Sequence, residues 1–279
     1  MLDNGVIKSI STEAQRRAGI AIPKGQIYLV EARLAPVARS EGYESQSELI
    51  RALEKVPEDR LWRRVVESLA DHETWFFRDP EPLNQFMSDI LPVLARVKAG
   101  KSPIRIWSAG CGTGQEAWSI AMLLEEQRAR LNGMDIEIVG TDICSRAIDR
   151  AQSAAYSQFE VQRGLSIHRL IEHFEPSGEQ WVLKNAIKRR ARFERGNLLK
   201  PSSRLGEFDI IFCRNVLSGM TSEARRHTLS QLAGRMSPAG YLVLGKGETI
   251  AGAGDMYRAL SGKRGIYART MQAGLKQAA

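Results

Sequence analysis

Glycines recur at every second position in one short stretch of the chain, which reads IRIWSAGCGTGQE. Gly110, Gly112 and Gly114 lack a side chain, so a ligand could approach the backbone closely there. The run before them, Ile104–Ser108, is mostly β-branched and aromatic, and the run after them, Glu116–Arg130, has apolar residues at helical spacing. A strand, a glycine turn and a helix N-terminus together form a cradle for a nucleotide-like ligand.

This loop departs from the GxGxxG dinucleotide pattern, because the helix begins earlier and a third close-packing glycine is missing. A tight turn between strand and helix is therefore the alternative interpretation. A downstream acid favours the ligand, since the buried-strand pattern Asp135–Asp142 (DIEIVGTD) ends on Asp142, with a helix from Ser145. There a carboxylate can accept hydrogen bonds from a ribose diol, although it could instead cap the following helix. The short loop suits a ligand with a ribose but no pyrophosphate, such as S-adenosylmethionine.

The elements that must position these residues fall into two parts. About the first 80 residues read as helical, with apolar residues at three- and four-residue intervals in Ile27–Arg39 and Ser45–Leu53, and Pro80–Gly100 follows as a helical connector. From Ile104 onward strands and helices alternate, which is typical of an α/β fold with a parallel sheet. The expected strands are Ile104–Ser108, Ile136–Thr141, Ala191–Arg195, Phe208–Cys213 and Tyr241–Gly245, with a last one near Ile266–Arg269.

One segment, Phe174–Lys188, interrupts this alternation. It has a turn at Pro176–Gly178 and then a short β-type run, Gln180–Leu183. We interpret it as a small antiparallel insert and not as another helical crossover.

Composition and charge narrow the class of function. The chain is 43% hydrophobic and 26% charged, as soluble globular proteins are, and its N-terminus, MLDNGVIKS, has no signal-peptide core. We therefore expect a cytoplasmic protein with no membrane insertion. The three cysteines and four histidines are scattered, so no metal site is expected. A net charge of +8 fits a nucleic acid, an acidic membrane surface or an acidic protein. Because neither basic cluster, Arg51–Arg64 or Lys188–Arg195, carries a single-stranded nucleic-acid platform of interleaved aromatic residues, an acidic protein is at least as good an explanation.

Several local strings occur in a characteristic order along the chain. DHETWFFRDP precedes the glycine loop SAGCGTGQEAWSIA, and GTDICSRAI, GNLLKP and FDIIFCRNVL follow it. Their order and spacing resemble the CheR family, the chemotaxis protein-glutamate O-methyltransferases. The resemblance runs from roughly Arg33 to Arg269, and FFRDP and FCRNVL are highly specific as a pair.

The resemblance implies an α/β fold with a Rossmann-like class I methyltransferase sheet. It implies an all-helical N-terminal domain at residues 1–80, a helical linker at 81–102 and an S-adenosylmethionine-binding domain at 103–279. A small antiparallel β-subdomain would be inserted at about 174–190. The pattern of helices and strands, taken by itself, gives the same three parts.

Site residues follow from the same resemblance. Arg78 and Arg214 would be catalytic, and Asp142 would bind the cofactor ribose. His72 stands where the family often has Asn. The implied cofactor contacts are His72, Thr74, Arg78, Gly110, Gly112, Glu116, Asp142, Asn197, Leu198, Arg214 and Asn215.

Simpler structural roles compete with these assignments. Trp75, Phe76 and Phe77 suit packing anchors better than ligand contacts, and Asn197 could be a turn residue. Arg78 could form an ordinary ion pair with Asp79 or Glu81.

The implied chemistry is displacement at the sulfonium methyl of S-adenosylmethionine, which leaves S-adenosylhomocysteine. A glutamate carboxylate is already an anionic nucleophile near neutral pH, so the protein must mainly orient it and exclude water. A guanidinium presents a planar fork to a carboxylate, which suits Arg78 and Arg214 to this task. The implied partners are the cytoplasmic domains of methyl-accepting chemoreceptors, with no nucleic acid, and the expected state is a monomer.

The chain also departs from the family pattern. Ser218, Gly219 and Met220 replace the usual IYF, so a tyrosine that would help to place the substrate is missing. Gln115 replaces a common glutamate, and GKGE at Gly245–Glu248 replaces the usual GHSE. A cofactor-binding signalling module with weak or lost transfer is therefore the alternative function. A nucleic-acid methyltransferase is a third reading, which the absence of a (D/N)PP(Y/F) pattern at FCRN disfavours.

Overall fold

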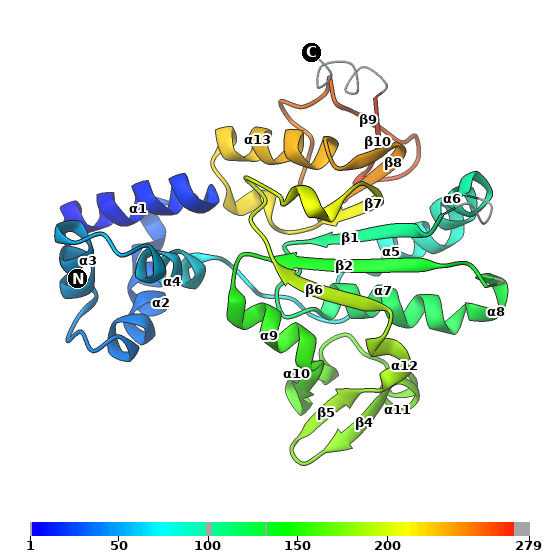
Figure 1. Cartoon of the computed structure of the whole chain (residues 1–279), viewed down its shortest axis with the longest axis horizontal. Helices are drawn as coiled ribbons and strands as arrows, with labels where there is room; N and C mark the ends of the chain where they lie inside the picture. The colour runs from blue at the N-terminus through cyan, green and yellow to red at the C-terminus, as the bar shows by residue number, and fades with distance from the viewer. Residues whose placement is uncertain (1, 99–101, 132, 271–279) are drawn as a thin grey trace.

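The computed structural model describes residues 2–98, 102–131 and 133–270. Its N-terminal part is built from the helices α1 (Asn4–Ala18), α2 (Ile27–Ser40), α3 (Gln46–Lys55) and α4 (Asp59–Leu69) (Figure 1). Asp3 and Ser45 cap α1 and α3 by accepting backbone N–H bonds from Val6 and Glu48. The apolar stripes of these helices meet in a separate small core, with Ile10, Leu34 and Leu49 almost fully buried.

The helical region of the N-terminal part ends about ten residues earlier than expected, at Leu69 and not near residue 80. Helix α4 stops at Leu69, and residues 70–79 form a non-helical linker that leads to α5 (Pro80–Gln85). Two linker residues have left-handed backbone, with φ of 53° at Phe77 and 44° at Asp79, a conformation that a continuing helix excludes. The helical connector that follows is confirmed as α5, a π-helical turn at Phe86–Ile90 and α6 (Leu91–Lys98).

The expected α/β architecture is present as a seven-stranded sheet in the described residues, with the order β6-β2-β1-β7-β8-β10-β9. The strands β6, β2, β1, β7 and β8 are parallel, and β10 pairs antiparallel with both β8 and β9. Their bounds are β1 (Ile104–Ala109), β2 (Ile136–Asp142), β6 (Ala191–Arg195), β7 (Phe208–Cys213), β8 (Met236–Leu244), β9 (Tyr257–Ala259) and β10 (Ile266–Arg269). From β1 the chain continues to β2 and β6 on one side of the sheet and then crosses to β7 and β8 on the other side. This reversal of strand order, between β1 and β7, opens a crevice beyond the carboxyl ends of the two strands.

Helices cover both faces of the sheet, because its central strands are apolar on both sides (Figure 1). On β1, Ile106 belongs to the core beneath α7 (Gln115–Glu126) and α9 (Ser145–Ser153), whereas Trp107 belongs to the core beneath α13 (Ser222–Ala233). The expected helix at 116–130 is divided in two, because α7 ends at Glu126 and α8 covers Arg128–Leu131.

The antiparallel insert is confirmed and starts earlier than expected. Its three strands, in the order β3-β5-β4, are β3 (Ala155–Ser157), β4 (Phe174–Ser177) and β5 (Gln180–Leu183). Helices α10 (Gln158–Gln162) and α11 (Ile167–His173) lie between β3 and β4 in the chain, and α12 (Asn185–Lys188) leads back to the main sheet. Along the described residues, no helix combines the length and apolar content needed to cross a bilayer.

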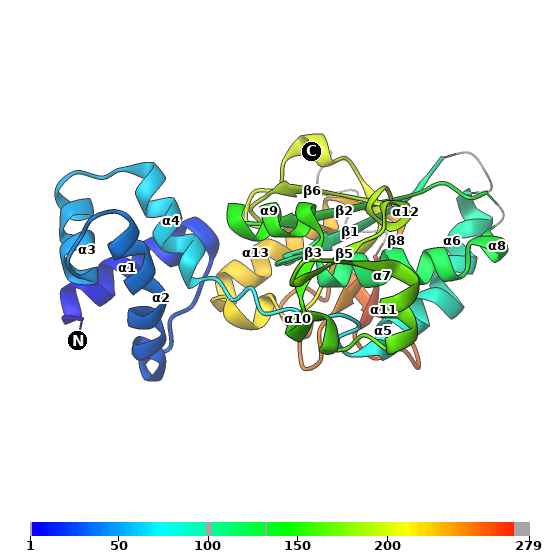
Figure 2. The same ribbon diagram turned by 90° about the horizontal axis from the view of Figure 1, so that it is seen from below.

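The N-terminal helices lie to one side of the sheet, and two of their connections to it are made by the backbone (Figure 2). One is the linker at 70–79. The other is a short antiparallel contact in which Ile20 bridges Met220, and the amide of Ala21 donates to the carbonyl of Gly219 at 2.9 Å. Both connections arrive at the carboxyl end of the sheet, where the crevice lies.

Candidate functional site

Two adjoining cavities open at the carboxyl edge of the sheet, and every predicted site residue lines at least one of them. The glycine-loop cavity is lined by Thr74, Arg78, Gly112, Glu116 and Arg214. The outer cavity, about 330 Å³ in volume, is lined by Asp142, Asn197 and Leu198. His72, Gly110 and Asn215 line both cavities. The fold therefore brings together residues that lie far apart in the sequence.

The glycine loop is shaped by close packing against the linker and against the loop after β7. All three glycines have positive φ, at 77° for Gly110, 55° for Gly112 and 95° for Gly114. A Cβ atom at Gly110 would lie 2.6 Å from a methyl of Val216, and one at Gly112 would lie 3.0 Å from the carbonyl oxygen of His72. Any larger residue would push away the linker or the loop after β7, so this turn does more than connect a strand to a helix.

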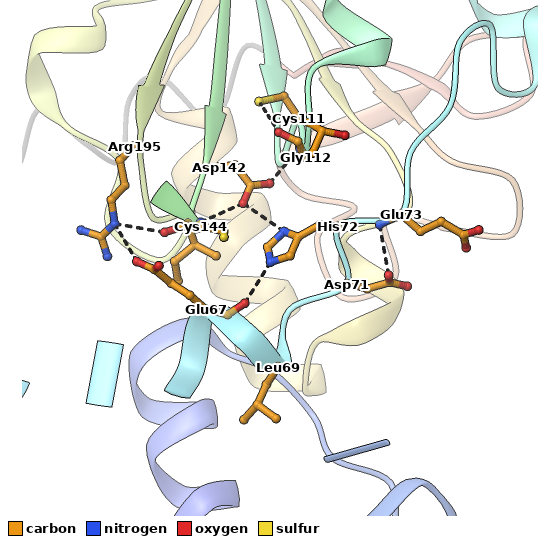
Figure 3. Close-up of polar contacts among 12 residues, drawn as sticks. Glu67, Leu69, Asp71, His72, Glu73, Cys111, Gly112, Asp142, Cys144 and Arg195 are labelled. Atoms are coloured by element: carbon orange, nitrogen blue, oxygen red, sulfur yellow. Dashed lines mark hydrogen bonds and ion pairs between the residues drawn. The ribbon is translucent and has the colours of Figure 1, made fainter. Parts of the chain in front are cut away.

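Asp142 ends β2 and is buried, with its carboxylate directed at the glycine loop (Figure 3). Oδ2 accepts the backbone N–H of Gly112, and Oδ1 accepts that of Cys144, both at 2.9 Å. The N-cap of α9 is Cys144, so Asp142 does not cap that helix. A carboxylate has about four acceptor positions, so these two bonds and the contact of Oδ1 with His72 leave about one position, on Oδ2, for a diol.

His72 joins the linker to this carboxylate (Figure 3). Its Nε2 lies 2.9 Å from the carbonyl oxygen of Glu67, and its Nδ1 lies 3.3 Å from Oδ1 of Asp142. Each ring nitrogen faces an oxygen, and this arrangement favours the doubly protonated ring, although Nδ1 and Oδ1 are not aligned for a hydrogen bond. Burial lowers the pKa of His72, but contacts with Asp142, Cys144 and the Glu67 carbonyl outweigh burial and raise the pKa to about 10.

The same cation affects the neighbouring thiol. Burial raises the pKa of Cys144, and contacts with His72 and the backbone N–H of Ala147 more than offset this, so the net shift of the pKa is downward. Beside it, Arg195 bonds the side chain of Glu67 at 3.1 Å and the carbonyl oxygen of Ile143 at 3.0 Å (Figure 3). The end of α4 is thus fixed to the ends of β2 and β6 by polar contacts at the edge of the site.

Arg214 is buried, and its guanidinium is largely occupied by protein groups. Its side chain is 2% exposed, and Nη1 lies 3.1 Å from a carboxylate oxygen of Glu116. Nη2 donates to the carbonyl oxygens of Arg78 at 2.7 Å and Asp79 at 3.2 Å. Nε has no hydrogen-bond partner within the described residues. The guanidinium of Arg214, which was expected to orient a substrate carboxylate, therefore holds the linker in place. This favours Arg78 as the residue that contacts a substrate.

Arg78 lines the glycine-loop cavity and stacks on Trp75. The centre of its guanidinium is 4.0 Å from the centroid of the indole ring, and Arg163 lies at the same distance. Since one face of the ring cannot hold both groups so closely, the indole is sandwiched between them. Nη1 of Arg78 donates to the carbonyl of Glu73 at 3.0 Å, and Asp79 lies 3.6 Å from Arg214, so the ion-pair alternative with Asp79 is not what fixes Arg78.

In the aromatic run of the linker Phe76 packs as expected, whereas Trp75 and Phe77 line the glycine-loop cavity. Phe76 is fully buried and makes edge contacts with Tyr156 and Phe174 of the insert, with ring centroids 5.1 and 5.6 Å apart. The amide of Phe77 donates to the hydroxyl of Ser119 on α7 at 2.9 Å. These contacts fix the segment that carries Thr74 and Arg78 into the cavity.

Asn197 has the turn role that competed with ligand binding. Its Oδ1 accepts the amide of Leu199 at 3.0 Å, and its Nδ2 donates to the carbonyl of Arg17 at 2.6 Å. It lines the outer cavity as well, beside the buried side chain of Leu198.

Sequence reasoning missed the part of the outer cavity that the N-terminal helices supply. Gln26, Leu29 and Arg33 come from the start and the first turns of α2, and Ala18 and Ile20 come from the end of α1 and the residues after it. Leu29 and Arg33 stand four residues apart on one helix face, which is the only signal for them in the sequence.

Comparison with known proteins agrees with this geometry. The family described as CheR methyltransferase, SAM binding domain, matches residues 72–266. Chemotaxis protein methyltransferase Cher2 of Pseudomonas putida is 34% identical over 256 residues, covering 90% of this chain and 93% of that protein. Chemotaxis protein methyltransferase 1 of Pseudomonas aeruginosa is 33% identical, covering 91% and 94%. The chain therefore belongs to the CheR family of S-adenosylmethionine-dependent chemotaxis methyltransferases.

Proposed function

We propose that this protein transfers the methyl group of S-adenosylmethionine to glutamate side chains of methyl-accepting chemoreceptors, in their cytoplasmic domains. The products are glutamate methyl esters and S-adenosylhomocysteine. The observation that carries the proposal is that Arg78 lines the same cavity as the glycine loop. The names of the relatives, chemotaxis protein methyltransferases, support the receptor as the partner.

The residues around the cavities fit the cofactor. Asp142 has acceptor capacity for the ribose hydroxyls, and Glu116 offers a carboxylate to the cofactor's amino group. The unpartnered Nε–H of Arg214 is a donor suited to the cofactor's carboxylate. Bound there, S-adenosylmethionine would supply an activated methyl group on a sulfonium.

The protein's own part in the reaction is to orient and dehydrate a carboxylate. A glutamate is ionised at neutral pH, so no strong base is needed, and positioning supplies most of the rate enhancement. Arg78 is held by the stack on Trp75 and by one bond to the Glu73 carbonyl, which leaves most of its fork for a substrate. A guanidinium fixed in this way can orient a carboxylate with little rearrangement.

Electrostatic attraction to an acidic receptor is weaker than the sequence indicates. In the basic run of the N-terminal helices, Arg51 pairs with Asp3 at 2.6 Å and Arg63 pairs with Asp59 at 2.8 Å. Arg60 and Arg64 both pair with Glu41. These contacts neutralise much of the run, so we expect the receptor to be recognised by more than charge.

The alternative, a cofactor-binding module without transfer, is not favoured by the family relationship. This alternative was based on Gly219, which stands where the family usually has a tyrosine. A Cβ atom at Gly219 would meet nothing within 4 Å. The fold therefore tolerates a side chain at this position, and the glycine does not reflect a steric demand of the site.

A transfer assay with radiolabelled cofactor tests the proposal. Cytoplasmic receptor fragments should become labelled, and mild base should release the label as methanol, because carboxyl methyl esters are base-labile. Fragments in which the labelled glutamates are replaced by alanine serve as the control, and RNA and DNA should remain unlabelled. Label that resists base would contradict glutamate esterification, and no labelling of any fragment would favour the binding module.

A further inference from the structure

Glu248 is a buried acidic residue that lines neither cavity. It lies in the turn after β8, where its own amide donates to the carbonyl of Gly245 at 3.0 Å. Its carboxylate accepts three backbone N–H bonds: Oε2 takes those of Asn215 at 2.7 Å and Gly245 at 2.9 Å, and Oε1 takes that of Ser218 at 3.0 Å. A buried carboxylate with three such donors is a strong local anchor.

The segment that Glu248 anchors is the β7 loop, defined as residues 214–219. Arg214, Asn215 and Val216 line the glycine-loop cavity, while Ser218 and Gly219 line the outer one. The β7 loop therefore contributes to both halves of the site, and Glu248 binds it at two points on either side of Val216.

The backbone of this loop is left-handed at its first anchored residue. Asn215 has a φ of 63°, in the region that asparagine adopts more readily than most non-glycine residues. Its N–H is one of those that Glu248 accepts, and the contact helps to hold this conformation. Val216, the next residue, packs against Gly110 closely enough to exclude a Cβ atom there.

The turn that carries Glu248 fits closely against the loop. A Cβ atom at Gly245 would lie 2.7 Å from the amide nitrogen of Asn215 and 2.8 Å from Oε2 of Glu248. Only glycine permits this approach, so Gly245 and Glu248 act together as a seat for the β7 loop.

We propose that Glu248 is a positioning residue for methyl transfer. It holds the β7 loop in the conformation that seats Val216 on the glycine loop and aligns Arg214 with the linker, and it touches neither cofactor nor substrate. This inference depends on the proposed function only in the experiments that measure methyl transfer.

Two substitutions test it. Glu248→Ala removes all three acceptor contacts. Glu248→Gln keeps the shape, but whichever way the amide is turned, its NH₂ group faces at least one backbone N–H. With the amide oxygen placed towards Asn215 and Gly245, the contact to Ser218 is the one that is lost.

Asp209 on β7 provides a matched control at the opposite end of the same strand. Its buried carboxylate also has three contacts: the amide of Arg105 at 2.9 Å, the hydroxyl of Ser237 at 2.9 Å and Nζ of Lys98 at 3.0 Å. It lines neither cavity. Asp209→Asn therefore reproduces the loss of a buried carboxylate without touching the β7 loop.

The measurements are single-turnover methyl transfer at saturating cofactor, Tm, and hydrogen exchange at the amides of Asn215 and Ser218. We expect Glu248→Gln to speed exchange at Ser218 and Glu248→Ala to speed it at both amides. Both variants should lower transfer at least tenfold, and Asp209→Asn, at a similar loss of Tm, should stay within twofold of the unmutated protein. Unchanged exchange at these amides, or transfer that falls in proportion to Tm in all three variants, would overturn the proposal.

Failure of the proposed function gives a different result. If the unmutated protein labels no receptor fragment, the substrate assignment is wrong, and Glu248 is then judged by exchange and by S-adenosylhomocysteine titration. Glu248→Ala should weaken that binding at least fivefold, because Asn215 and Val216 line both cavities. Unchanged affinity together with unchanged exchange would overturn the positioning role.

Discussion

His72 faces Asp142 across the edge of the cofactor site, with 3.3 Å between Nδ1 and Oδ1. One residue belongs to the linker and the other ends β2, so the contact joins the cofactor site to the N-terminal helices. Because Nε2 of the same ring faces the Glu67 carbonyl, the cation is held from both sides. This relationship makes both stability and cofactor binding depend on His72.

The first prediction concerns pH. The pKa of His72 is raised to about 10 in the folded protein, against about 6.5 in an unfolded chain. The stabilising effect of the cation is therefore complete below about pH 6.5 and is lost as pH rises through about 10. Urea unfolding should show the unmutated protein more stable than His72→Asn at pH 6, with the difference shrinking towards pH 10. His168→Asn, at an exposed histidine outside both cavities, controls for the replacement of a histidine as such.

The second prediction concerns the ribose contact. Asp142→Ala removes the carboxylate that both anchors the amide of Gly112 and has capacity for a diol. S-adenosylhomocysteine binding should weaken by about 2 kcal/mol, the typical effect of losing hydrogen bonds to a charged group. Calorimetric titration measures this. Unchanged affinity in a folded variant would remove Asp142 from the site.

Arg78 carries the third prediction. Arg78→Lys keeps the charge and loses the planar fork, so turnover should fall at least tenfold, or about 1.4 kcal/mol of barrier. Cofactor affinity should change little. Arg163→Lys is the matched control, because Arg163 stacks on the same indole and does not line either cavity. Equal losses of turnover in the two variants would assign the effect to the stack on Trp75 and not to substrate contact.

Arg214→Lys should behave differently from Arg78→Lys. The sequence alone indicates a loss of turnover with cofactor affinity nearly unchanged. In the structure the Arg214 guanidinium binds Glu116 and two linker carbonyls, and a lysine cannot satisfy all of them. We therefore expect lower Tm, weaker S-adenosylhomocysteine binding and lower turnover together. If Arg214→Lys keeps the unmutated affinity for S-adenosylhomocysteine while its turnover falls tenfold, Arg214 has the role in substrate binding that was expected from the sequence.

Sequence patterns predicted the central sheet well because its strands are long and apolar. Phe208–Cys213 is buried at every position, and a run of that kind has few other interpretations. The strands β3 and β9 were missed, since three residues such as Ala155–Ser157 form no period. The linker at 70–79 was read as helix because the helical pattern before it is strong, while its left-handed residues leave no clear mark in the sequence.

The site residues also fall into those that motifs predicted and those that depend on tertiary packing. Residues within the recognised strings, such as Thr74 and Asp142, were placed at the cavities by motif alone. The lining from α2 was missed, because Leu29 and Arg33 belong to no motif and reach the site only through tertiary packing. The engagement of Arg214 by linker carbonyls depends on backbone geometry between residues 78 and 214, which no local pattern encodes.

The seat formed by Gly245 and Glu248 has a consequence for how the protein is made. A chain emerging from the ribosome has already produced the glycine loop and the β7 loop before residues 245–248 appear. Until then the left-handed backbone at Asn215 lacks the carboxylate that holds it. We therefore expect nascent chains that end before residue 245 to fold much of the sheet without retaining the cofactor.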